Sequence, residues 1–135
     1  MDTQQIFNDS YRRCLLNEQF FEAFYDILLE KNDKFRLMFK GTDMKRQIKM
    51  LKLSIAILLL TSSSDSAKDQ FRVFAKRHGP DGVGASPIDF DVWLESLLIT
   101  VRLSDPKYDK HIEAAWRDCF QTGLAIMREE CQPEM

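Results

Sequence analysis

The sequence predicts an all-α protein. Apolar residues recur at the three- and four-residue spacing of an amphipathic helix in several windows along the chain. Only five glycines and four prolines are present, which leaves little room for the many tight turns of an all-β fold. A chain of 135 residues fits one domain, so we expect a single domain over 1–135, with 131–135 as a frayed tail or the start of a linker.

The composition indicates a soluble protein of the cytoplasm. The net charge is −2 and no basic stripe is present, so a nucleic-acid partner is not expected. Cys14, Cys119 and Cys131 are widely spaced and odd in number, which favours a reducing compartment over a disulfide framework. The N-terminus does not resemble a signal peptide. The most apolar run, 53–60, is far shorter than the roughly 20 residues of a membrane span, so no membrane partner is expected.

Four helices are expected in the first half of the chain, at 3–16, 18–31, 35–39 and 43–61. The second of them carries a dense face of aromatic residues, and Asn17 is its expected N-cap. A break at 41–43 precedes the long fourth helix, for which Thr42 is the expected N-cap. The polar residues 62–66 are expected to form a loop or a cap.

Three helices are expected in the second half, at 71–78, at 87 to about 103, and from a lead-in at 105–106 to about 130. Ser86 and Pro87 form a strong start for the middle one, since serine caps helices and proline favours the first helical position. Gly123 lies inside the last helix at a cost of about 1 kcal/mol relative to alanine, which predicts close packing against a neighbour.

His78 is the first candidate for chemistry. It extends the apolar face formed by Phe71, Phe74 and Ala75, and the glycine-rich turn after it ends the helix. A lone histidine on such a face is more often structural, but neutral imidazole is also a common metal ligand.

Four blocks of residues stand out along these elements: Phe24-Tyr25, Met38 to Met44, Ala75 to His78 with Gly82-Val83, and Ala114 to Arg117. Their order and spacing carry a resemblance to a bacterial globin of the three-on-three type, closest to sensor-type or single-domain globins. It spans about residues 20–127. It implies a globin fold, a three-on-three helical sandwich around a pocket for haem b.

The resemblance also implies roles for single residues. His78 matches the proximal ligand of the haem iron, and Tyr25 and Gln47 match the polar pair that faces a bound gas. The residues expected to contact the cofactor are Phe39, Leu51, Phe74, Arg77 and Val83. Alternative roles remain open: Tyr25, Phe39 and Leu51 can be core residues, Gln47 a surface residue, and Arg77 a solvated charge.

One departure from the family pattern bears on the activity. Flavohaemoglobins and their single-domain relatives surround the proximal histidine with a glutamate and a tyrosine, which favour O–O chemistry. The matching positions here are Cys131 and Phe90, and Glu130 lies one residue away. An enzymatic function is therefore not the favoured interpretation. The stretch 104–127 looks closer to globin domains that precede signalling output domains.

The leading hypothesis is a haem globin that reversibly binds O2, or NO and CO, for sensing or storage. The alternative is a nitric-oxide dioxygenase or weak peroxidase that works with a separate reductase. A third hypothesis is a structural or regulatory globin-like domain without haem, and His78, Phe39 and Gln47 together count against it. The resemblance also allows an output domain or partner protein that responds to the bound gas. A homodimer through the last two helices is also expected, with apolar contributions from Trp93, Leu97, Phe120, Leu124 and Met127, and with Gly123 allowing close approach. The alternative is a monomer in which these residues are ordinary core.

Overall fold

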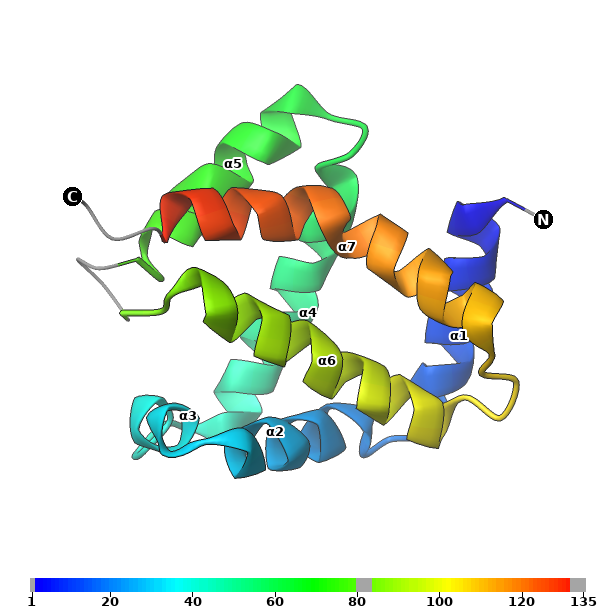
Figure 1. The fold of residues 1–135 in the computed structure, drawn as a ribbon, viewed down its shortest axis with the longest axis horizontal. Helices are drawn as coiled ribbons and strands as arrows, with labels where there is room; N and C mark the ends of the chain where they lie inside the picture. Colours follow the sequence, from blue (N-terminus) through cyan, green and yellow to red (C-terminus); the bar gives the residue numbers. More distant parts are fainter. Residues whose placement is uncertain (1, 80–83, 132–135) are drawn as a thin grey trace. The chain divides into compact units, whose positions relative to one another are not determined.

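The computed structural model describes residues 2–79 and 84–131. Over these residues the chain forms seven helices and no strand, which confirms the all-α prediction (Figure 1). The helices are α1 (Thr3–Leu15), α2 (Phe20–Lys31), α3 (Asp33–Met38), α4 (Met44–Leu60), α5 (Asp65–Lys76), α6 (Pro87–Ser104) and α7 (Lys110–Glu130). Within the described ranges, no helix is long and apolar enough to cross a membrane.

The chain divides into two compact units, which are described separately. The first consists of Met1–Thr42 and Val92–Cys119, and it holds α1, α2, α3, most of α6 and the first half of α7. The second consists of Asp43–Asp91 and Phe120–Met135, and it holds α4, α5, the start of α6 and the rest of α7. The expectation of one domain over residues 1–135 stays a prediction.

Several helix starts are set by side chains that accept hydrogen bonds from the first free backbone N–H groups. Asp2, Asn32 and Ser64 cap α1, α3 and α5 in this way, with N···O distances of 2.8, 3.0 and 3.1 Å. The cap by Ser64 confirms that the polar stretch 62–66 contains a helix cap.

Two predicted caps are wrong. The N-cap of α4 is Asp43 rather than Thr42, because the Asp43 carboxylate accepts hydrogen bonds from two backbone N–H groups of the first turn. The second error concerns α2, which begins three residues after Asn17 instead of directly after it. Asn17 Oδ1 accepts a hydrogen bond from the backbone N–H of Gln19 at 3.1 Å, so this side chain closes a turn ahead of the helix.

The helix expected at 71–78 is longer and differently placed. It is α5, which starts at Asp65 and ends at Lys76. The early start was missed because the first turn and a half of the helix is polar apart from the buried Ala67, so that no apolar period marks it. His78 lies in the turn just beyond the helix.

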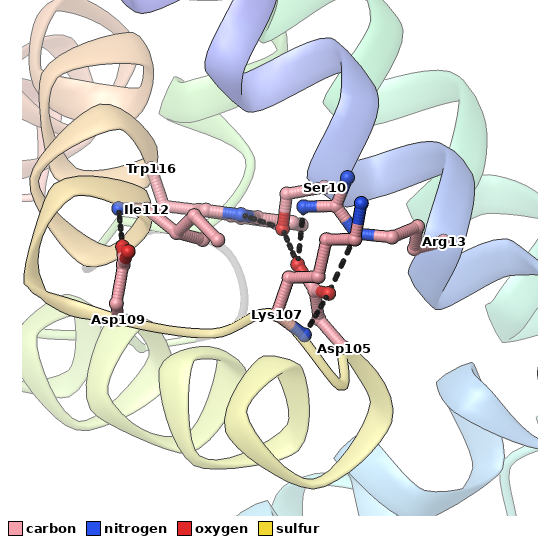
Figure 2. A network of polar contacts seen from close by, with 7 residues as sticks. All are labelled: Ser10, Arg13, Asp105, Lys107, Asp109, Ile112 and Trp116. Carbon is pink, nitrogen blue, oxygen red and sulfur yellow. Dashed lines mark hydrogen bonds and ion pairs between the residues drawn. The ribbon is translucent and has the colours of Figure 1, made fainter.

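A buried polar network holds the first unit together (Figure 2). The Asp105 carboxylate, whose side chain has no exposed surface, forms an ion pair with Arg13, with 2.6 Å between Nε and Oδ1. It also accepts hydrogen bonds from Ser10 Oγ at 2.6 Å and from the backbone N–H of Lys107 at 2.9 Å. Ser10 Oγ in turn accepts a hydrogen bond from Trp116 Nε1 at 2.9 Å. The network therefore joins α1, the α6–α7 connection and α7.

In the second unit, α7 packs closely against α4 at Gly123. A Cβ atom added to Gly123 would lie 2.3 Å from Leu58 Cγ, which confirms the close packing predicted for this glycine. Gly123 therefore allows close packing against a helix of the same chain. The other apolar side chains expected to join two copies are largely buried as well: Leu97, Phe120, Leu124 and Met127. The homodimer through the last two helices stays a prediction.

Candidate functional site

The histidine singled out from the sequence is held by the end of α5. His78 Nδ1 lies 3.2 Å from the backbone oxygen of Phe74, one helical turn earlier. A carbonyl oxygen can only accept a hydrogen bond, so Nδ1 carries the proton and Nε2 presents its lone pair. The ring also contacts the Phe74 ring, with 4.6 Å between centroids at an angle of 52°. These two contacts set both the tautomer and the orientation of the imidazole.

The surroundings of His78 keep it neutral. Burial lowers the pKa of His78, and this effect outweighs the opposing one of the hydrogen bond to Phe74. Among the described residues, none forms a hydrogen bond with Nε2. A neutral imidazole with a free Nε2 lone pair is the form that binds a metal ion.

The main chain around His78 is fixed on both sides. Its N–H donates to the backbone oxygen of Ala75 at 2.9 Å, and its own oxygen accepts from the N–H of Ala85 at 2.8 Å. Gly79 is needed next to it, because an added Cβ would lie 2.9 Å from the backbone oxygen of Glu130 at the end of α7. The position of the histidine therefore depends on α5, on the following turn and on α7, all in the second unit.

The start of α6 completes this turn. The backbone N–H of Ser86 donates to the Asp89 carboxylate at 2.8 Å, and Ser86 Oγ donates to the same oxygen at 3.2 Å. A side chain at the third helical position that reaches back to the residue before the helix is one half of a capping box. The helix start predicted at Ser86 and Pro87 is confirmed.

Glu130 and Cys131, at the end of α7, interact with groups other than the imidazole of His78. Glu130 pairs with Arg72, with 3.3 Å between Oε1 and Nη1, where α5 and the end of α7 run side by side (Figure 1). The thiol of Cys131 is buried and lies 3.6 Å from the backbone oxygen of Ala75. Burial raises the pKa of Cys131, so it is a neutral thiol at pH 7. Within the described part of the chain, no carboxylate forms a hydrogen bond with the imidazole of His78.

The predicted polar residue Gln47 and the apolar Leu51 lie one turn apart on α4. Leu51 is buried, and Gln47 is half-buried. The neighbouring Lys45, Arg46 and Lys49 are all exposed. Gln47 is therefore set apart from the charged face around it, which argues against a simple surface role.

Two other predicted residues lie together in the first unit. The rings of Tyr25 on α2 and Phe39 at the end of α3 meet edge to face, with 5.6 Å between centroids and 67° between planes. Tyr25 is only 4% exposed, whereas Phe39 is half-buried. Tyr25 also contacts Phe24, which in turn packs on Trp93. An edge-to-face chain of this kind stabilises a core and also fixes the direction of the phenol.

The structure thus groups the predicted residues in three places. Tyr25 and Phe39 meet in the first unit. In the second unit Gln47 and Leu51 share α4, and Phe74 and His78 are in contact at the end of α5. Arg77, the C-cap of α5, is exposed, and Val83 lies outside the described residues.

Two features of the site were missed by reading the sequence. One is the hydrogen bond from His78 to the Phe74 carbonyl, which a four-residue spacing allows but does not require. The other is the close approach of Gly79 to the end of α7. A glycine directly after a candidate ligand is a signal for such an approach as well as for the end of a helix.

Comparison with known proteins supports the fold. No family model matches the sequence, and no curated protein matches it significantly. A crystal structure of a Pseudomonas aeruginosa protein, described as structurally highly homologous to human hemoglobin, superposes with a TM-score of 0.90. The match covers 98% of this chain and 100% of that chain, at 26% sequence identity. The chain has a bacterial globin-like fold. In this globin-like chain, α5 and the turn after it present the histidine, and α4 presents the glutamine.

Proposed function

We propose that this globin-like chain binds haem b through His78 and reversibly binds O2, NO or CO for sensing or storage. The observation that carries the proposal is the hydrogen bond of 3.2 Å between His78 Nδ1 and the Phe74 carbonyl. It leaves Nε2 as the ligating atom and holds the ring in one orientation. Metal-bound histidines usually donate their other ring N–H in this manner, often to a backbone carbonyl.

The chemistry of the other residues fits the same cofactor. Phe39 is half-buried, so part of its ring remains available to pack on a flat apolar ligand. Phe74 is likewise half-buried beside His78. Leu51 offers an apolar side chain, and the guanidinium of Arg77 is available to pair with a propionate. When bound, haem iron supplies an open coordination position for a diatomic gas.

Tyr25 and Gln47 would hold the gas. A phenol O–H and an amide N–H are hydrogen-bond donors, and such donors favour a ligand with partial negative charge over a less polar one. We therefore expect them to slow the release of O2 more than that of CO. The ring contact between Tyr25 and Phe39 limits the directions that this hydroxyl can take.

The second shell of His78 favours gas binding over oxygen chemistry. A carboxylate beside the proximal imidazole would make it a stronger electron donor. Here Glu130 pairs with Arg72, and Cys131 is a buried neutral thiol beside the Ala75 carbonyl. Neither group supplies such a charge to the imidazole, so a dioxygenase or peroxidase has less support.

The test is the absorption spectrum of the purified protein in the ferric, ferrous and gas-exposed states. We expect a haem spectrum for the wild type and a loss of haem, or of the axial ligand, in His78→Ala. The chain holds two histidines, so His111→Ala, on the exposed surface of α7, is the matched control and should keep the wild-type spectrum. Free imidazole should restore the axial ligand in His78→Ala. A normal ferrous spectrum in His78→Ala, or no haem in the wild type, would overturn the proposal.

A further inference from the structure

α4 carries a second apolar face, which is exposed. Its buried face consists of Leu51, Ile55 and Leu58. On another side of the helix lies a stripe of four residues: Met50, Leu53, Ile57 and Leu60. Three of them are 47%, 67% and 55% exposed (Met50, Leu53 and Leu60), and Ile57 is half-buried. No other helix in the described part of the chain carries more than two large exposed apolar side chains.

The spacing of the α4 stripe is that of a helix-pairing seam. Its members are separated by three, four and three residues, which is the a/d pattern of a heptad repeat. Single exposed apolar residues are normal on a protein surface, but a continuous stripe over three turns of helix marks a contact site. The small residues Ser54 and Ala56 flank the stripe, so a second helix can approach closely.

The charges beside the stripe favour one direction for that helix. The first half of α4 carries four exposed basic residues: Lys45, Arg46, Lys49 and Lys52. The last turn of α4 has no basic residue. Two parallel copies of α4 would place both basic halves side by side. Two antiparallel copies would place each basic half beside the C-terminal end of the other copy's α4, which is electrostatically favourable because that end carries a partial negative charge.

We propose that a second copy of this chain packs against the α4 stripe, with the two α4 helices antiparallel about a two-fold axis. In antiparallel seams an a position meets a d position, so Met50 of one copy meets Leu60 of the other, and Leu53 meets Ile57. A two-fold axis repeats each of these contacts, and so one stripe serves both copies.

The size of the contact predicts a weak dimer. A stable interface usually buries about 800 Å² on each partner, and one helix face of three turns offers less. We therefore expect a dissociation constant on the order of 10 μM, so that monomer and dimer exchange in the micromolar range. Since α4 also carries Gln47 and Leu51, dimerisation would place the proposed gas-binding helix at the interface. The dimer itself does not depend on haem.

Sedimentation equilibrium between about 1 and 200 μM tests the association. We expect the average mass of the wild type to rise from 15.8 kDa toward twice that value. Leu53→Glu should raise the dissociation constant by about tenfold or more, because two glutamates would enter an apolar seam. Leu103→Glu is the matched control, since Leu103 is 73% exposed on α6, and it should dimerise like the wild type. A monomer at all concentrations, or equal behaviour of both variants, would overturn the proposal.

Cysteine cross-linking in a Cys119→Ser background tests the direction of the helices. This background removes the half-buried thiol and leaves the two buried ones. A mixture of Met50→Cys and Leu60→Cys proteins should form a disulfide-linked dimer under mild oxidation, and each protein alone should form much less. Efficient cross-linking of Met50→Cys with itself would show parallel helices and overturn the antiparallel arrangement.

Discussion

Removal of the Asp105 carboxylate should destabilise the protein strongly, because this group is the centre of the buried network in Figure 2. In Asp105→Ala, Arg13 loses an ion pair of 2.6 Å, and Ser10 Oγ and the Lys107 N–H each lose their acceptor. Breaking a buried ion pair by removing one partner costs about 3–5 kcal/mol. The Arg13 side chain is 24% exposed and regains some solvent, so we expect the lower end, about 3 kcal/mol.

The measurement is thermal or urea unfolding followed by circular dichroism. An unfolding entropy of about 2.1 cal/mol/K per residue over 135 residues converts 3 kcal/mol into a loss of about 10 °C in Tm. Asp109→Ala is the matched control. Asp109 is exposed and accepts one hydrogen bond, from the N–H of Ile112 at 2.9 Å, so its loss should cost only about 1 kcal/mol.

The pH dependence gives an independent check on the same residue. Burial alone would raise the pKa of Asp105, but the hydrogen bonds from Arg13 and Ser10 outweigh it and hold the pKa below its ordinary value. The stabilisation is therefore fully present above the unfolded pKa of about 3.9 and is lost as the pH falls through the lower folded value. The difference between wild type and Asp105→Ala should shrink only in that acidic window. A difference below about 1 kcal/mol at pH 7, or one independent of pH, would refute the reasoning.

Two further predictions concern the site and the packing around α4. Tyr25→Phe and Gln47→Leu should each raise the O2 dissociation rate by about tenfold to hundredfold, since a hydrogen bond to a charged acceptor contributes about 1.5–3 kcal/mol. Stopped-flow kinetics with O2 and CO measure this, and unchanged O2 rates in both variants would remove the pair from the site. Gly123→Ala should cost about 1–3 kcal/mol by overpacking against Leu58, yet be neutral or stabilising in a Leu58→Ala background. Thermal unfolding of the four proteins decides this, and an equal cost in both backgrounds would mean that Leu58 is not the obstacle.

The elements were largely predictable because their signals are local. Apolar spacing located six of the helices closely, and Ser86 with Pro87 marked the start of α6. The errors also have local causes. Thr42 and Asp43 are both good caps, and only the geometry of the chain decides between neighbours. Asn17 likewise serves a turn as readily as a helix start.

Contacts between residues far apart in sequence were not predictable. Nothing about Ser10 or Asp105 marks them as partners, since 95 residues separate them and either could be a surface residue. Gly123 shows an intermediate case. Its position inside a helix predicts a close neighbour, but only the structure identifies Leu58. Periodicity also cannot distinguish an intermolecular face from a buried one: the structure buries Leu97 and Phe120, and the homodimer at the last two helices stays a prediction.

The orientation of His78, the candidate ligand, was partly predictable. The end of α5 itself supplies the acceptor for its ring N–H, so no contact distant in sequence is needed. A helix leaves its last carbonyl groups without intrahelical partners. α5 ends at Lys76, so the backbone N–H of His78 bonds to Ala75 rather than to Phe74. The Phe74 oxygen accepts from the Arg77 N–H and has a second lone pair for His78 Nδ1. If the helix continued, the His78 N–H would compete for that oxygen. The end of α5 just before the histidine is therefore part of the site, and the glycines after His78 indicate such an end more plainly than the hydrogen bond that it allows.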